Sequence, residues 1–240
     1  MHQGDTVVHG SFFGQSSFAT YALATERNVV KVRADIPFEL LGPLGCGIQT
    51  GAGAVINALA PRAGSSLVVF GTGAVGLSAI MAARVVGCTM IIGVDIRPQR
   101  LALAQELGAT HIINGREGTT VEQITGGGAS YSLETTAVPA LVRQAVDCLE
   151  TTGTCGVLGA AAPGTEFSLD MGTVGLGRTV RGIIEGDSIP DVFIPQLIEL
   201  YVQGRFPFDK LIKTYLFAEI NAAVAASESG ETVKPVLPFA

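Results

Sequence analysis

Short apolar runs alternate with longer segments of helical periodicity through the middle of the chain. The runs are rich in β-branched residues, which is typical of strands buried on both faces of a sheet. They cover residues 67–70, 89–95, 111–113, 130–134, 155–159 and 179–184. The helical segments between them cover residues 76–86, 98–107, 119–125, 138–149 and 170–176. Six strands separated by helices predict an α/β fold with a doubly wound (Rossmann) six-stranded parallel sheet.

The two ends of the chain have a different pattern. Residues 11–33 predict short strands joined by polar turns, without crossover helices. Residues 191–203 predict a helix. Its apolar face consists of Ile194, Leu197, Ile198 and Tyr201. A second helical face consists of Phe217, Ile220 and Val224, and a last strand is predicted within residues 231–239. We therefore expect three parts, at residues 1–47, 48–184 and 185–240.

The strongest motif is a glycine-rich turn after the first predicted strand. The sequence VVFGTGAVG fits the pattern GxGxxG with Gly71, Gly73 and Gly76. The motif follows a strand and opens a helix, and Asp95 ends the next strand 19 residues after Gly76. This context is typical of a dinucleotide-binding site, in which the backbone amides at the helix start face the pyrophosphate. The alternative is a glycine turn that binds no ligand.

Asp95 indicates which dinucleotide binds. Its carboxylate can accept hydrogen bonds from the ribose hydroxyls of NAD, whereas it would repel the 2′-phosphate of NADP. Arg97 and Arg100 are the counter-argument, because an arginine can hold that phosphate. The sequence therefore predicts NAD as the cofactor.

Composition excludes several classes of protein. The chain has 240 residues, of which 48% are hydrophobic and 15% charged, so we expect a folded protein with a large core. Lys and Arg number 15 against 21 Asp and Glu, which leaves a net charge of −6 and makes nucleic acid an unfavourable partner. The uncharged stretch 67–83 is interrupted by glycines, so it predicts a strand, a turn and a helix rather than a membrane span.

The four cysteines indicate a reducing compartment. Cys46, Cys88, Cys148 and Cys155 form no CxxC pair, and the first residues resemble no signal peptide, so we expect a cytoplasmic protein. Cys46 differs from the others because it lies between two glycines in GPLGCGIQTGAGAV. That position is open enough for a thiolate ligand, although a lone cysteine is also compatible with a small buried side chain.

Several motifs together resemble one family. The segments GPLGCGIQTGAGAV, VVFGTGAVGLSAIMAA and GVDIRPQRLALAQELGATHIIN are similar to the zinc-containing alcohol dehydrogenases of the medium-chain superfamily. The segment FFGQSSFATYALATERNVVKV resembles the aryl-alcohol (benzyl-alcohol) branch. The resemblance extends almost from end to end. It implies that residues 1–47 and 185–240 are parts of a GroES-like, β-rich catalytic domain around the Rossmann domain.

The resemblance also implies a site. Cys46 matches a ligand of the catalytic zinc, and Thr50 and Val75 match positions that line the nicotinamide. Positions of the pyrophosphate loop correspond to Gly71, Gly73 and Gly76, and those of the adenosine ribose site to Asp95 and Arg100. Backbone contacts to the carboxamide end of the nicotinamide correspond to Val157 and Leu158. Lys234 matches a basic residue that reaches the pyrophosphate.

The chain also departs from the family pattern. The part of the family that supplies the other Cys and His ligands of catalytic zinc, and the structural zinc loop, has no counterpart. His2, His9 and His111 lie outside any matching motif. The segment from Gly115 to Ser132 is a few residues shorter than usual, and Ser130 replaces a common Asp, so we expect a changed loop there.

Three functions follow from these observations. The first is zinc-assisted, NAD-dependent oxidation of a primary aryl alcohol to an aldehyde, with this chain supplying the NAD-binding part and being inactive alone. The second is a zinc-free quinone or enoyl reductase, which Cys46 and Asp95 disfavour. The third is a non-catalytic NAD-binding module. The family also pairs its last sheet strand across a two-fold axis, so we expect a homodimer through residues 179–184.

Overall fold

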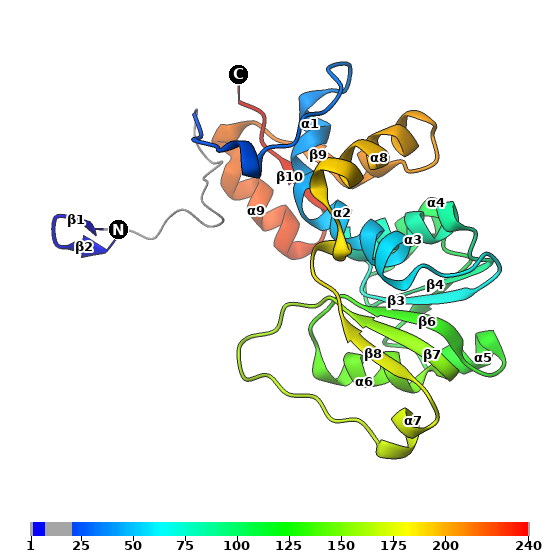
Figure 1. Cartoon of the computed structure of the whole chain (residues 1–240). Helices are drawn as coiled ribbons and strands as arrows, with labels where there is room; N and C mark the ends of the chain where they lie inside the picture. The colour runs from blue at the N-terminus through cyan, green and yellow to red at the C-terminus, as the bar shows by residue number, and fades with distance from the viewer. Residues whose placement is uncertain (1, 8–20, 240) are drawn as a thin grey trace.

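The central element of the structure is a parallel six-stranded sheet. The computed structural model describes residues 2–7 and 21–239. Within them the strand order is β5-β4-β3-β6-β7-β8 (Figure 1), which confirms the predicted doubly wound α/β fold. The strands are β3 (Ser66–Phe70), β4 (Met90–Asp95), β5 (His111–Asn114), β6 (Ala129–Glu134), β7 (Leu149–Val157) and β8 (Thr179–Gly182). The winding reverses at β3, and β8 forms one edge, as predicted.

Helices cover both faces of this sheet because successive side chains of each strand point to opposite faces. Leu67 and Val69 of β3 belong to the hydrophobic core on one face, and Val68 and Phe70 belong to the core on the other face. Helices α3 (Ala74–Val86) and α4 (Pro98–Leu107) contribute to the first core. Helices α5 (Val121–Thr125) and α6 (Pro139–Asp147) contribute to the second.

The strand β7 begins six residues earlier than the apolar pattern predicts. Near its start, residues 150–152 are polar and exposed, and Thr152 has a φ of +67°. The pairing with β6 shifts register between Ala129 and Tyr131. Such a bulge interrupts the alternation of inward- and outward-facing residues. The start of this strand therefore could not be recognised from a repeat of two residues. The short helix α7 (Met171–Gly175) precedes β8 where a helix was expected.

A helical segment before the sheet was not predicted. It consists of α1 (Phe38–Leu41), η3 (Gly42–Gly45), α2 (Gly47–Gly53) and the π-helical η4 (Ala54–Leu59). Helix α2 packs closely on α3: a Cβ on Gly51 would lie 2.0 Å from the carbonyl oxygen of Val75. The glycines therefore serve helix packing here, which outweighs their low helix propensity.

The prediction of strands in residues 11–33 is wrong for the part that the structure describes. Residues 21–33 contain only the 3-10 helix η2 (Glu26–Asn28), and residues 11–20 lie outside the described range. A strand needs a hydrogen-bonded neighbour, and none of the described segments pairs with residues 21–33. The described N-terminal residues form a small antiparallel pair, β1 (His2–Gln3) and β2 (Thr6–Val7).

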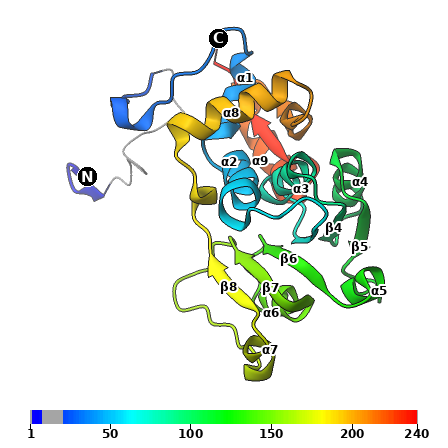
Figure 2. The same ribbon diagram turned by 45° about the vertical axis from the view of Figure 1, so that its right-hand side comes forward.

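The C-terminal part folds back beside α1, away from the sheet (Figures 1 and 2). The predicted helix is α8 (Pro190–Val202), which buries Ile194, Leu197 and Ile198 as expected. It is followed by η6 (Phe208–Leu211), β9 (Ile212–Thr214), η7 (Phe217–Glu219), α9 (Ile220–Ser229) and β10 (Lys234–Val236). The η5 turn (Glu185–Asp187) connects β8 to α8.

Two predictions for this part need correction. The face proposed for this helix is exposed at Phe217 and Val224, and the buried residue of α9 is Ala223. The last strand is limited to β10, which pairs in parallel with β9. No helix among the described residues is long and apolar enough to cross a membrane. The domain boundaries at residues 47 and 184 remain predictions.

Candidate functional site

The glycine loop joins β3 to α3 at the point where the sheet reverses its winding. Gly71 has a φ of +89°, and a Cβ on it would lie 2.6 Å from Oγ1 of Thr135. A Cβ on Gly76 would lie 1.9 Å from the carbonyl oxygen of Gly71. By contrast, a Cβ on Gly73 would have no heavy atom within 4 Å. The loop is thus closed at both ends and open at its middle, as a phosphate-binding turn requires.

The carboxylate of Asp95 lies beside this loop at the end of β4. Its Oδ2 accepts hydrogen bonds from the amide (2.7 Å) and the hydroxyl (2.8 Å) of Thr72. Its Oδ1 accepts hydrogen bonds from the amides of Ile96 (2.7 Å) and Arg97 (3.0 Å). Four bonds fill the acceptor capacity of a carboxylate. A ribose hydroxyl would therefore take the place of one of these donors, most simply the Thr72 hydroxyl.

Both arginines near Asp95 bind the C-terminal segment. Arg100 is buried and donates to the carbonyls of Gly230 (3.1 Å) and Thr232 (3.2 Å). Desolvation by burial lowers the pKa of its guanidinium, while Asp95 acts in the opposite direction. Arg97 donates to the carbonyl of Glu228 (3.2 Å). Each guanidinium is thus anchored to the C-terminal segment, Arg100 by two of these bonds and Arg97 by one. The role of Arg100 at the ribose remains a prediction.

Lys234 reaches the glycine loop from the far end of the chain. A Cβ built on Gly47 would lie 3.7 Å from Nζ of Lys234 and 3.7 Å from Cβ of Ala74. The ammonium group is therefore near the first residue of α3, where the helix dipole also favours an anion. The contact of Lys234 with the pyrophosphate remains a prediction.

Cys46 and Thr50 lie together at the start of α2, and one acidic residue contacts both. The carboxylate of Glu185 accepts a hydrogen bond from Oγ1 of Thr50 (3.2 Å) and lies 4.0 Å from Sγ of Cys46. Cys46 is exposed, but crowding of its sulfur by protein atoms raises the pKa of the thiol. The negative charge of Glu185 raises that pKa further, and Lys234 lowers it.

The remaining predicted cofactor residues lie around the same edge. Val75 is in the first turn of α3, against Gly51 of α2. Val157 ends β7, and the amide of Leu158 donates to the carbonyl of Glu134 (2.9 Å). The structure thus brings Cys46, Thr50, Val75 and Lys234 to one end of the glycine loop and Asp95 to the other.

Sequence reasoning missed two acidic residues. Glu134 is fully buried at the end of β6, where its side chain binds the amides of Thr136 (2.6 Å) and Ala137 (3.1 Å). Glu185 follows β8 in the sequence EGDS. Their common signal is an acid at or just after the carboxyl end of a predicted strand, which is where ligands bind in open α/β sheets.

A metal site is not assembled by the described residues. Within residues 2–7 and 21–239, no group of three His, Cys, Asp or Glu side chains could hold a metal ion. His111 is exposed and lies 2.9 Å from Oγ1 of Thr110, and His9 is outside the described residues. Cys46 as a zinc ligand remains a prediction.

The segment after β5 borders a cavity of about 350 Å³. Phe70, Val94 and Val121 line it on the face covered by α5 and α6, together with Gly115 from the segment itself. None of the predicted site residues contributes to its wall. The segment contains the five-residue helix α5, and a loop that differs from the family's remains a prediction. This cavity carries none of the predicted chemistry.

The cysteines supply a prediction that separates Cys46 from the rest. Cys88, Cys148 and Cys155 are buried, and burial raises the pKa of Cys88 and Cys155 to about 11. With raised pKa values these thiols stay protonated at pH 8. Ellman's reagent reacts with thiolates, so the buried thiols should be unreactive in the native protein. We expect one thiol per native chain to react and four after denaturation. In the Cys46→Ser variant the native count should fall to zero, and a second fast thiol in the native protein would contradict the burial.

Comparison with known proteins gives consistent matches. Residues 74–203 match a family described as zinc-binding dehydrogenase. Geraniol dehydrogenase from Castellaniella defragrans is 48% identical over 97% of this chain and 64% of that protein. The crystal structure of benzyl alcohol dehydrogenase from Acinetobacter calcoaceticus is 52% identical with a TM-score of 0.93, over 95% of this chain and 64% of that one.

A third match is the crystal structure of an alcohol dehydrogenase zinc-binding domain protein from Burkholderia ambifaria. It is 59% identical with a TM-score of 0.92, over 95% of this chain and 63% of that chain. This chain therefore spans 63–64% of the length of these relatives.

Proposed function

Because this chain belongs to the zinc-binding dehydrogenase family, we propose that it forms the NAD-binding part of an alcohol dehydrogenase. The reaction is oxidation of a primary alcohol, with an aryl alcohol as the substrate class, to the aldehyde. The name benzyl alcohol dehydrogenase supports an aryl alcohol, and the name geraniol dehydrogenase supports a primary alcohol only, because geraniol has no aromatic ring. A cytoplasmic location, as expected from the cysteines, remains part of the proposal.

One observation carries the assignment of NAD. Of the three glycines in the loop between β3 and α3, Gly73 borders open space, whereas a Cβ on Gly71 or Gly76 would collide with neighbouring atoms. The residues therefore fit a pyrophosphate above Gly73. Bound NAD supplies the acceptor for the hydride of the alcohol.

The chain's own residues bind and orient that cofactor. The amides at the start of α3 and the ammonium of Lys234 balance the pyrophosphate charge. Asp95 accepts ribose hydrogen bonds, and Thr50 with Val75 limits the position of the nicotinamide. Among the described residues Cys46 and Glu185 are too few for a tetrahedral zinc site, which needs three protein ligands and an open position, so no step is assigned to the metal.

The experiment that tests this function uses the chain as it is. We expect calorimetry to show NAD+ binding, elemental analysis to show no zinc, and the assay with benzyl alcohol to show no NADH production. A single thiolate does not retain zinc against water and buffer, which is the physical reason for the last two results. One zinc per chain that depends on Cys46, with turnover abolished in Cys46→Ser, would contradict this expectation.

The same measurements separate the alternatives. A chain that does not bind NAD+ would overturn the proposed function entirely. NADPH-dependent reduction of a quinone would favour the zinc-free reductase. Binding of NAD+ by this chain, together with an upstream reading frame that encodes a Cys and a His–Glu pair, would distinguish the dehydrogenase from a non-catalytic module.

We also propose a homodimer through the β8 edge. Among the described strands β8 pairs only with β7, so its outer edge has unpaired backbone groups. Next to it, Ile184 is 81% exposed and Ile189 is 69% exposed. Light scattering should give about twice the chain mass of 24.7 kDa. The Ile184→Lys variant should shift the mass toward the monomer, whereas Phe38→Lys, at an equally exposed site away from β8, should not. A monomer at all concentrations would contradict the dimer.

A further inference from the structure

Glu185 has an unusual backbone conformation directly after the edge strand β8. Its φ is +48°, and the next two residues, Gly186 and Asp187, also have positive φ values of +68° and +49°. For a residue other than glycine this conformation costs about 1–2 kcal/mol, and such residues concentrate at functional sites. The conformation of Glu185 is therefore a reason to ask what its side chain does.

The η5 turn is fixed in place by close packing on α2. A Cβ on Gly53 would lie 2.5 Å from the carbonyl oxygen of Gly186, and a Cβ on Gly186 would lie 2.7 Å from Cα of Gly53. Asn57 donates to Oγ of Ser188 (3.2 Å) at the end of the same contact. The position of the Glu185 side chain relative to α2 is thus set by the backbone on both sides.

The carboxylate of Glu185 is partly buried and is held by neutral donors. Its Oε2 accepts hydrogen bonds from Oγ1 of Thr50 (3.2 Å) and Nε2 of Gln49 (3.3 Å). Gln49 is 3% exposed, and its Oε1 has no partner among the described residues. No lysine or arginine of the described chain forms an ion pair with Glu185, in contrast to Asp187, which pairs with Arg181. Among the described residues, no direct ion pair therefore neutralises the carboxylate of Glu185, and the cation whose charge acts on the neighbouring Cys46 is Lys234.

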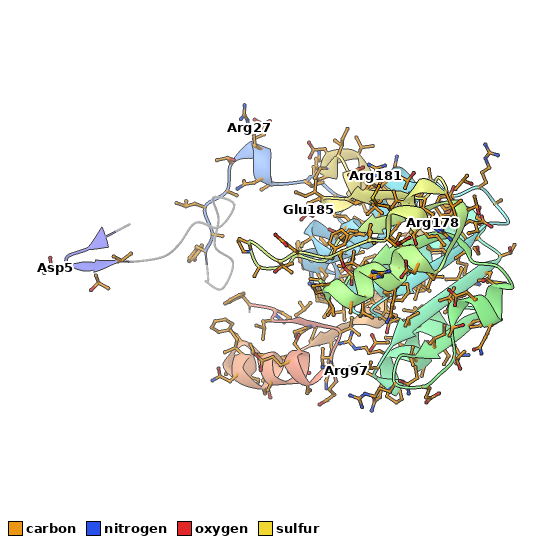
Figure 3. The ribbon with its side chains drawn as sticks, turned by 90° about the horizontal axis from the view of Figure 1, so that it is seen from below. Asp5, Arg27, Arg97, Arg178, Arg181 and Glu185 are labelled. Carbon is orange, nitrogen blue, oxygen red and sulfur yellow. The ribbon has the colours of Figure 1, made fainter. Side chains whose placement is uncertain are left out.

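The topology indicates which half of a dinucleotide comes near this charge. A dinucleotide crosses the carboxyl ends of the strands at the switch point, with its pyrophosphate at the glycine loop. Asp95, at the end of β4, marks the adenosine side. The second nucleotide then extends over the ends of β6, β7 and β8, and Glu185 lies three residues beyond β8. In Figure 3 Glu185 is labelled near the middle of the molecule, whereas Arg97, two residues after Asp95, is labelled at the lower edge.

We propose that Glu185 is a specificity residue that favours the oxidised cofactor, NAD+, over NADH. The nicotinamide ring carries a unit positive charge in NAD+ and none in NADH, so a carboxylate without an ion-pair partner beside the ring stabilises the oxidised form more than the reduced form. The contact of Glu185 with Thr50 ties this charge to a residue expected at the nicotinamide. The inference rests on the proposed function and adds a determinant of redox-state preference to it.

The test compares three ligands in three proteins. Dissociation constants of NAD+, NADH and ADP-ribose are measured by calorimetry, at one ionic strength, for the unmodified chain, Glu185→Gln and Asp187→Asn. We expect Glu185→Gln to weaken NAD+ binding by about fivefold, which is typical of one partly exposed charge pair. Binding of NADH and ADP-ribose should change less than twofold. Asp187→Asn, in the same turn but already paired with Arg181, should leave all three unchanged.

Each outcome decides the inference. Equal weakening of all three ligands would show that Glu185 only maintains the structure of the site, and unchanged NAD+ binding would show that its charge is remote from the ring; either result overturns the proposal. If the unmodified chain binds none of the three ligands, the proposed function itself fails. That result differs from the two above, in which the chain still binds NAD+. Thermal unfolding of Glu185→Gln is expected to match that of the unmodified chain, because glutamine fills the same space.

Discussion

Replacing Gly76 by alanine is expected to reduce the free energy of unfolding by about 3 kcal/mol and to abolish NAD+ binding. The added Cβ would lie 1.9 Å from the carbonyl oxygen of Gly71 and 3.1 Å from Cγ1 of Val69. The nearer of these atoms belongs to the backbone, so no side-chain movement can relieve the contact. The loop between β3 and α3 must open instead. Urea denaturation and an NAD+ titration measure the two effects.

Gly73→Ala is the matched control within the same loop. Its Cβ would meet no protein atom within 4 Å, and its φ of −76° suits any residue. We therefore expect a change in unfolding free energy of less than about 0.5 kcal/mol. The affinity for NAD+ should nevertheless fall by about tenfold or more, because the methyl group occupies the space left for the pyrophosphate. Normal NAD+ binding by Gly73→Ala would show that the phosphate does not bind at this turn.

The sheet could be predicted from the sequence because its signals are local. The strands β3, β4 and β5 are short runs rich in Val and Ile. In the turn at residues 71–76, the spacing of the glycines is itself the signal. The helix α2 could not be predicted in the same way. Its glycines argue against a helix, and their purpose, the close approach of Gly51 to α3, appears only when two segments are packed together.

The residues of the candidate site likewise differ in how far the local sequence predicts them. Asp95 follows the glycine motif at a fixed spacing, so its place beside the loop was predictable from the sequence. Lys234 was identified only through the resemblance to a family. Cys46 had one local signal, its two flanking glycines, which was equally compatible with a small buried side chain. Glu185 was missed because its contacts with Thr50 and Gln49 join positions about 135 residues apart. No pattern of residues along the chain records such a contact.

NAD+ is expected to bind at least about tenfold more tightly than NADP+. The carboxylate of Asp95 would face the 2′ position, where it accepts bonds from a hydroxyl and repels a phosphate. The structure adds a second reason. Arg97 and Arg100, the residues that could balance a 2′-phosphate, donate to the carbonyls of Glu228, Gly230 and Thr232. Using them would break contacts that hold the C-terminal segment.

The Asp95→Asn variant removes the charge and keeps the size of the side chain. We expect it to narrow the preference for NAD+ to less than about threefold, by improving NADP+ binding through loss of repulsion and weakening NAD+ binding through loss of a charged acceptor. Both cofactors are titrated by calorimetry at one ionic strength. Thermal unfolding is measured alongside, because Asp95 also accepts bonds from Thr72, Ile96 and Arg97. Equal affinities in the unmodified chain, or a preference unchanged in a stably folded Asp95→Asn, would show that Asp95 does not select the cofactor.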